Sequence, residues 1–119
     1  MVVGASQGIG LGFVRHLLND DRFTDLWATY RHPETATGLL ALKGDPRLHC
    51  YPLEATEEGE IAQLAAKLQG QGHCLDLVIS CVGVLHQGDL QPEKSLRQID
   101  ADQLLRYFQI NSIPAILLA

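Results

Sequence analysis

Residues 2–12 read VVGASQGIGLG, and this stretch decides the fold. Two β-branched residues come first, as at the end of a short strand, and apolar residues at helical spacing follow. Between them Gly4, Gly8 and Gly10 have the spacing G-x-x-x-G-x-G. A strand that turns through glycines into a helix is typical of a phosphate-binding turn, because the helix N-terminus offers unpaired N–H groups and a positive dipole end. Gly12 is expected to serve close packing of that helix.

The rest of the chain alternates between short apolar strands and helical periods. No repeat or linker interrupts the alternation, so we treat residues 1–119 as one domain. Strands that alternate with helices at this spacing form right-handed βαβ units around a parallel sheet. We predict an α/β, Rossmann-like fold with about four strands in the order 3-2-1-4 and helices on both faces. The predicted strands cover residues 1–3, 26–30, 48–53 and 75–82, and the predicted helices cover residues 9–19, 35–43, 56–68 and 100–118.

Local patterns predict further details of these elements. Thr56 is followed by three acids within four positions, which is typical of a helix N-cap and an acidic first turn. The run LDLVISCV at residues 75–82 carries one charge, which predicts a strand buried on both faces. Asp100 or Asp102 is expected to cap the last helix. The apolar face of the first helix is predicted to consist of Ile9, Phe13, Leu17 and Leu18.

A dinucleotide site also needs a residue that reads the adenine ribose, about 20 positions after the glycines and at the end of the second strand. The second strand, LWATY at residues 26–30, ends without an acid that could accept the ribose 2′-hydroxyl. Arg31 follows it, and a planar guanidinium suits a 2′-phosphate. A solvated surface arginine is the alternative. The sequence therefore favours NADP(H) over NAD(H) as the ligand.

Composition argues against several classes of partner. The net charge of −5 and the isoelectric point near 5.4 supply no basic face for a nucleic acid. No apolar stretch approaches the ~20 residues of a membrane-spanning helix, and no basic segment precedes an apolar one as in a signal peptide. We therefore expect a cytoplasmic protein without membrane contact. The three cysteines form no C-x-x-C pair, which suits a reducing compartment, and we expect no metal site.

Four stretches together resemble a known family. GASQGIG at residues 4–10 looks like the glycine signature of the short-chain dehydrogenases/reductases. PLEAT at residues 52–56 has an acid where that family places one near the adenine, with Glu in place of the usual Asp. SCVG at residues 80–83 keeps the glycine of the family's Asn-Asn-Ala-Gly turn and lacks both asparagines. FQINSIPAILL at residues 108–118 is similar to the helix that carries the family's catalytic asparagine.

The resemblance implies a role for each matching residue. Asn111 is the one catalytic position present, and Arg31 is the partner of the 2′-phosphate. Gln7 stands where NADP-preferring members often carry a basic residue, so the NADP(H) assignment depends on Arg31. Tyr30-Arg31 and GVLH at residues 83–86 look most like the C-factor and Sniffer carbonyl reductases. The residues implied at the pyrophosphate are Gly4, Ser6, Gly8, Ile9 and Gly10. Those implied around the adenine and the central ribose are Glu54, Ala55, Cys81, Val82 and Gly83.

The family's reaction, hydride transfer to or from a carbonyl or alcohol, uses a Tyr-x-x-x-Lys pair and an upstream serine. The tyrosines at positions 30, 51 and 107 are followed four residues later by Glu, Ala and Asn, none of them lysine. The resemblance thus covers the dinucleotide-binding half, truncated in the family's fifth helix. We expect no reductase activity from these 119 residues alone, and a small carbonyl compound as substrate of a full-length parent. The alternative is a non-catalytic binding or assembly module.

The C-terminal helix is expected to mediate association. It is apolar on more than one face, and the outer edge of the fourth strand lacks a predicted partner. We therefore expect homo-oligomers formed through this helix and this edge. Pro114 predicts a kink, because proline removes one N–H and leaves the Ile110 carbonyl without its helical partner.

Overall fold

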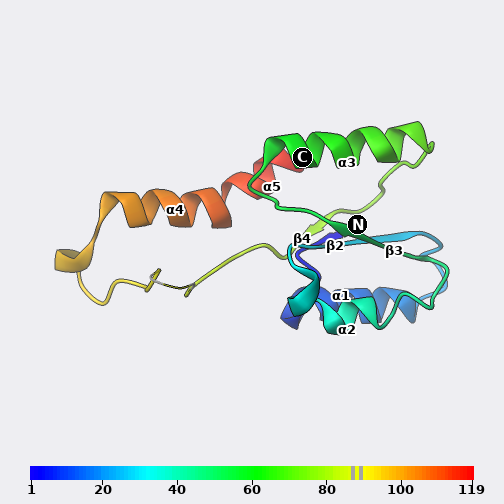
Figure 1. Ribbon diagram of the computed structural model, residues 1–119, viewed down its shortest axis with the longest axis horizontal. Coiled ribbons are helices and arrows are strands. Elements are labelled where there is room, and N and C mark those ends of the chain that lie inside the picture. The colour runs from blue at the N-terminus through cyan, green and yellow to red at the C-terminus, as the bar shows by residue number, and fades with distance from the viewer. Residues whose placement is uncertain (87, 89) are drawn as a thin grey trace.

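A parallel sheet between two layers of helices forms the body of the molecule. The structure, a computed structural model, describes residues 1–86, 88 and 90–119. Its elements in chain order are β1 (Val2–Val3), α1 (Gly8–Leu18), β2 (Leu26–Tyr30), the 3₁₀ turn η1 (Pro33–Thr35), α2 (Thr37–Leu40), β3 (Leu48–Pro52), α3 (Glu58–Gly70), β4 (Ile79–Ser80), the 3₁₀ turn η2 (Leu96–Gln98), α4 (Ala101–Asn111) and α5 (Ile113–Leu117). Helices α1 and α2 cover one face of the sheet, and α3 covers the other (Figure 1).

The four strands are parallel and lie in the order β3-β2-β1-β4. The predicted fold class and strand order are therefore confirmed. β2 and β3 pair over five residues, from Leu26 opposite Leu48 to Tyr30 opposite Pro52. Because all strands run the same way, their carboxyl ends meet at one edge of the sheet, where open α/β folds bind ligands.

Two apolar cores lie on opposite faces of this sheet. Successive strand residues alternate between them, as the two-residue period of a strand requires: Val2 belongs to one core and Val3 to the other. Each fully buried Leu or Val contributes about 1.5–3 kcal/mol to folding. The core beneath α1 contains Val2, Ala5, Leu11, Val14, Leu17, Leu26, Ala28, Ala36, Leu39 and Leu48. The core beneath α3 contains Val3, Trp27, Leu53, Ala55, Leu64 and Leu68.

Helix α1 buries a different face from the predicted one. Gly10, Val14 and Leu17 face the sheet, whereas Ile9 and Phe13 are 77% and 38% exposed. The strand-to-helix turn decides this orientation, because a Cβ at position 10 would collide with the backbone of that turn. Residues one helical turn apart share a side, so the contact at Gly10 turns Val14 and Leu17 inward. The prediction that Ile9 and Phe13 belong to the apolar face that this helix buries was wrong.

Strand β4 is shorter and more exposed than predicted. Only Ile79 and Ser80 pair with β1, and no described residue pairs with their other side. Leu77 and Val78 are 45% and 38% exposed. The prediction of a strand buried on both faces over residues 75–82 was wrong, because the apolar run lies at the edge of the sheet and has a neighbour on one side.

Two helices begin or end differently from the prediction. The N-cap of α3 is Glu57, and the Thr56 hydroxyl donates instead to the Glu54 carboxylate at 3.0 Å. The helix predicted over residues 35–43 is limited to α2, preceded by the 3₁₀ turn that Pro33 opens.

The C-terminal helical segment begins with α4, which projects away from the sheet (Figure 1), and it ends with Leu118 packed against the core beneath α3. The Asp100 carboxylate accepts a hydrogen bond from the Gln103 N–H at 3.0 Å, which confirms Asp100 as its N-cap. The segment breaks at Ser112, and Pro114 lies in the first turn of α5, as the predicted kink requires. The structure describes all of α4, and none of its residues is buried. No helix among the described residues has the length and apolar character needed to cross a bilayer.

Candidate functional site

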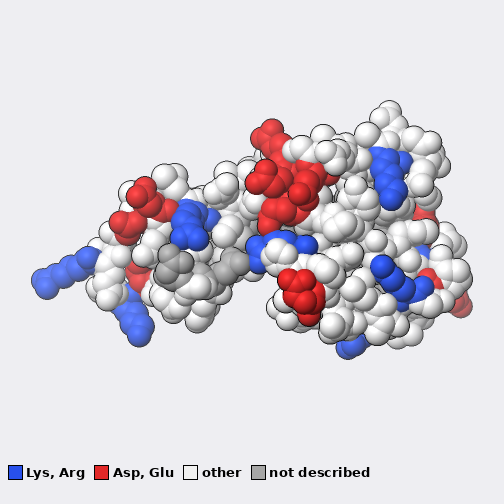
Figure 2. All heavy atoms as spheres, in the orientation of Figure 1, with Lys and Arg blue, Asp and Glu red and all other residues white. Residues whose placement is uncertain are grey.

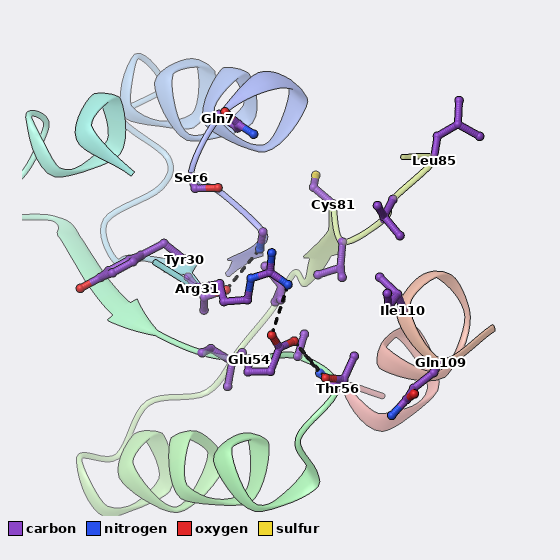
Figure 3. A pocket seen from close by; sticks show the side chains of 18 of the residues that line it. Ser6, Gln7, Tyr30, Arg31, Glu54, Thr56, Cys81, Leu85, Gln109 and Ile110 are labelled. Atoms are coloured by element: carbon purple, nitrogen blue, oxygen red, sulfur yellow. Dashed lines mark hydrogen bonds and ion pairs between the residues drawn. The ribbon is translucent and has the colours of Figure 1, made fainter. Parts of the chain in front are cut away.

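A cavity of about 660 Å³ opens at the carboxyl edge of the sheet (Figure 3). It lies where the four strands end, and the last turns of α4 close one side. Nine residues that the sequence assigned to a dinucleotide line it: Gly4, Ser6, Gln7, Arg31, Glu54, Ala55, Cys81, Val82 and Gly83. Other lining residues were not predicted, among them Thr29, Thr56, Arg106, Gln109 and Ile110.

The turn after β1 depends on Gly4. Its φ of +78° lies in the left-handed region, and a Cβ there would lie 3.0 Å from the carbonyl carbon and oxygen of Cys81. The Gly4 N–H donates to the Thr29 hydroxyl at 3.2 Å, and the Ala5 N–H donates to the Thr29 carbonyl at 2.7 Å. Thr29 is the one buried polar residue in the apolar strand LWATY, a signal that could have identified it from the sequence.

Helix α1 starts directly after this turn and presents its N-terminus toward the same edge. Gly8 has a φ of +56°, with no described atom within 4 Å of a Cβ built on it. The first turn, GIGL, carries no acid, and the first N–H groups of any α-helix lack partners within the helix. Gly8, Ile9 and Gly10 are not among the residues that line the cavity. They lie beside it, adjacent to Gln7, which does line it.

The glycines within α1 differ in their surroundings. A Cβ at Gly10 would fall inside contact distance of the Gly4 carbonyl oxygen and 3.0 Å from the Ala5 Cα. Gly10 therefore allows the helix to lie against the turn. A Cβ at Gly12 would have no described atom within 4 Å, and Gly12 is exposed. The prediction that Gly12 serves close packing was wrong.

Arg31 and Glu54 lie next to each other in the wall of the cavity (Figure 3). Arg31 Nη1 lies 3.4 Å from Glu54 Oε2, and the two side chains are 44% and 29% exposed. Arg31 follows β2, and Glu54 lies between β3 and α3, so the parallel pairing of the two strands brings these residues together. Figure 2 shows acidic side chains gathered where α3 begins, next to a basic one. Glu58 and Glu60 supply acids to that first turn.

The segment after β4 is held to α4 by side chains of that helix. Asn111 Oδ1 accepts from the Val84 N–H at 2.6 Å, and Asn111 Nδ2 donates to the Val84 carbonyl at 2.9 Å. The Tyr107 hydroxyl donates to the Leu85 carbonyl at 2.9 Å. Asn111 is not a lining residue of the cavity. Its amide group pairs with the backbone as a neighbouring strand would, which fixes the loop that follows β4.

The thiol in the cavity wall belongs to Cys81, and its surroundings disfavour the ionised form. Burial raises the pKa of Cys81 above its ordinary value, and burial does the same at Cys50, where the charge of Lys43 opposes it. All three cysteines are free. Among the residues that the structure describes, no three potential ligand side chains are arranged to hold a metal ion.

Comparisons with known proteins agree with this architecture. A sequence model of the short chain dehydrogenase family matches residues 1–119. No curated protein sequence gives a match. A solved structure described as the carbonyl reductase Sniffer of Caenorhabditis elegans is 30% identical, with a TM-score of 0.80 over 98% of this chain and 49% of that one. An NADPH-bound carbonyl reductase from chicken fatty liver is also 30% identical, with a TM-score of 0.81 over 98% of this chain and 44% of the other.

The carbonyl reductase Sniffer of Drosophila melanogaster shares the fold at 24% identity, with a TM-score of 0.85 over 99% of this chain and 47% of that one. The chain thus spans about half the length of these structures. Their similarity confirms the resemblance to Sniffer-like carbonyl reductases that the sequence motifs indicated. Because the family match covers the whole chain, this protein belongs to the short chain dehydrogenase family.

Proposed function

We propose that this chain binds NADP(H) in the cavity and forms the dinucleotide-binding part of a short-chain oxidoreductase. The observation that carries the proposal is Arg31 at the cavity wall, at the end of a strand that has no acid for a ribose 2′-hydroxyl. A chicken carbonyl reductase that is 30% identical binds NADPH, which supports the same choice of cofactor.

The residues present fit such a ligand. The turn at Gly4 and the open space at Gly8 let a pyrophosphate approach the N-terminus of α1. In this proposal Ser6, Gln7, Ile9 and Gly10 complete that turn. The adenine lies near Glu54 and Ala55, and the central ribose lies near Cys81, Val82 and Gly83. When bound, the cofactor supplies a hydride to a carbonyl or accepts one from an alcohol.

We expect no turnover from these 119 residues by themselves. They contain no Tyr-x-x-x-Lys pair to donate a proton, and the amide of Asn111 is engaged by the Val84 backbone. The purified chain is tested for NADPH oxidation with a panel of aldehydes and ketones. Turnover that Gly8→Asp abolishes would contradict this expectation.

Calorimetric titration with NADPH and NADH tests the binding proposal. Arg31→Ala removes charge-assisted hydrogen bonds of about 1.5–3 kcal/mol, so NADPH affinity should fall about 10- to 100-fold and NADH affinity less than about twofold. Arg22→Ala is the matched control, because Arg22 pairs with Asp20 in the loop after α1. Equal losses for both nucleotides would contradict the role of Arg31.

The competing function is a non-catalytic assembly module, and the surface of α4 and α5 favours self-association in either case. Leu105, Phe108 and Ile116 are 65%, 59% and 74% exposed, and the outer edge of β4 is unpaired among the described residues. Sedimentation velocity should show dimers or larger species that Phe108→Glu dissociates. A monomeric wild-type chain would contradict self-association, and an oligomer that binds neither nucleotide would favour the assembly module.

A further inference from the structure

The carboxylate of Glu54 is engaged on both of its oxygens by groups of the protein. Oε2 lies 3.4 Å from Arg31 Nη1. Oε1 accepts from the Thr56 N–H at 3.2 Å and from the Thr56 hydroxyl at 3.0 Å. The Glu54 N–H in turn donates to the Glu60 carboxylate at 2.6 Å. Glu54 is therefore fixed at its backbone and at its side chain, with its charge directed at Arg31 (Figure 3).

This arrangement affects Arg31, the residue that the proposed function assigns to the 2′-phosphate. Arg31 already has a carboxylate partner, so a phosphate that approaches it meets a pair with no net charge. Both side chains are partly exposed, and water screens the pair, so the ion pair is weak enough to exchange partners. A phosphate bound to Arg31 would also lie near the negative charge of Glu54 and be repelled by it.

We propose that Glu54 is an internal counterion that competes with the 2′-phosphate for Arg31, an inference that rests on the proposed function. It thereby reduces the preference of this site for NADP(H) over NAD(H). Glu54 acts here as a specificity-determining residue through Arg31, in contrast to the adenine contact that the family resemblance implies. The two roles differ in their consequences, because the adenine is common to both cofactors and the 2′-phosphate belongs to one of them.

Glu54→Gln separates the two roles. The glutamine carbonyl can still accept the hydrogen bonds from Thr56, so the substitution removes mainly the negative charge. We expect NADPH and 2′-AMP to bind about 3- to 10-fold more tightly, while NADH and AMP change less than about twofold. The salt dependence of NADPH binding should also become steeper, because the phosphate then meets an uncompensated cation. Glu58→Gln is the matched control, since it removes the same charge in the first turn of α3.

A double-mutant cycle completes the test. In an Arg31→Ala background, Glu54→Gln should change the ratio of NADPH to NADH affinity less than it does in the wild-type background, because only the direct repulsion between Glu54 and the phosphate is then removed. If Glu54→Gln leaves the ratio of NADPH to NADH affinity unchanged, the counterion role is overturned. A loss of affinity for both nucleotides also overturns it and supports the adenine contact. Binding of NADPH by Glu54→Gln with none by the wild-type chain supports the counterion role. Failure of every variant to bind either nucleotide overturns the proposed function and this inference with it.

Discussion

Replacement of Gly10 by alanine should destabilise the chain and distort the turn between β1 and α1, where we propose that the pyrophosphate binds. The new Cβ would fall inside contact distance of the Gly4 carbonyl oxygen, and would lie 2.9 Å from the Gly4 carbonyl carbon and 3.0 Å from the Ala5 Cα. These atoms are backbone, and hydrogen bonds to Thr29 hold them, so they cannot move aside as a flexible side chain can. Overpacking of this kind costs about 1–3 kcal/mol or more, against a gain of about 1 kcal/mol from helix propensity.

Because the collision is with fixed backbone atoms, the cost should lie at the upper end of this range. The net loss should then be about 2 kcal/mol, which corresponds to a melting temperature lower by roughly 6–10 °C in a chain of this size. Gly12→Ala is the matched control one half-turn further along α1, where a Cβ would meet no described atom within 4 Å. It should raise the melting temperature by roughly 3–5 °C through helix propensity alone. Differential scanning calorimetry measures both variants, and NADPH titration should show a loss of affinity in Gly10→Ala only. Equal melting temperatures for the two variants would refute the packing argument.

Three further results are expected. Iodoacetamide should alkylate exposed Cys74 before Cys81, whose pKa is raised by burial, and peptide mass spectrometry that finds the opposite order would contradict this. Asn111→Ala should speed hydrogen exchange of the Val84 amide about fivefold, because the acceptor of its hydrogen bond is lost. Asn111→Asp keeps an acceptor oxygen and should leave this exchange rate unchanged. Hydrogen bonds from Arg47 lower the pKa of Asp45 below 3.8, so their stabilisation is present above that pH and is lost as the pH falls through the lowered pKa. The free energy of unfolding in urea should therefore differ most between Asp45→Asn and the wild type at neutral pH, and the two values should converge in acid. A difference in this free energy that stays constant with pH would contradict the prediction.

The strand order and fold class could be predicted because the alternation of strands and helices leaves few arrangements of a parallel sheet. The details that failed depend on tertiary neighbours. LDLVISCV has the composition of a central strand, yet only Ile79 and Ser80 pair, because the number of neighbours of a strand is not encoded in its own apolar run. The buried face of α1 was likewise decided by the contact at Gly10 rather than by the positions of Ile9 and Phe13.

Much of the candidate site was predictable because parallel strands deliver the residues that follow them to one edge. Gly4, Arg31 and Cys81 lie on the cavity wall for this reason. The contribution of α4 was not predictable, since no spacing in the sequence determines where a distant helix docks. The pairing of Arg31 with Glu54 was missed as well, although their strand-end positions placed both residues at the same edge.

The attachment of α4 to the loop after β4 has an evolutionary consequence. Asn111 and Tyr107 form these hydrogen bonds with main-chain groups of Val84 and Leu85, so the bonds impose no side-chain identity on that loop. Substitutions there can accumulate without displacing the helix, as long as these two side chains of α4 are kept. Relatives of this chain can therefore diverge in the loop beside the cavity, and so vary what lies next to the cavity, while the position of the helix is retained.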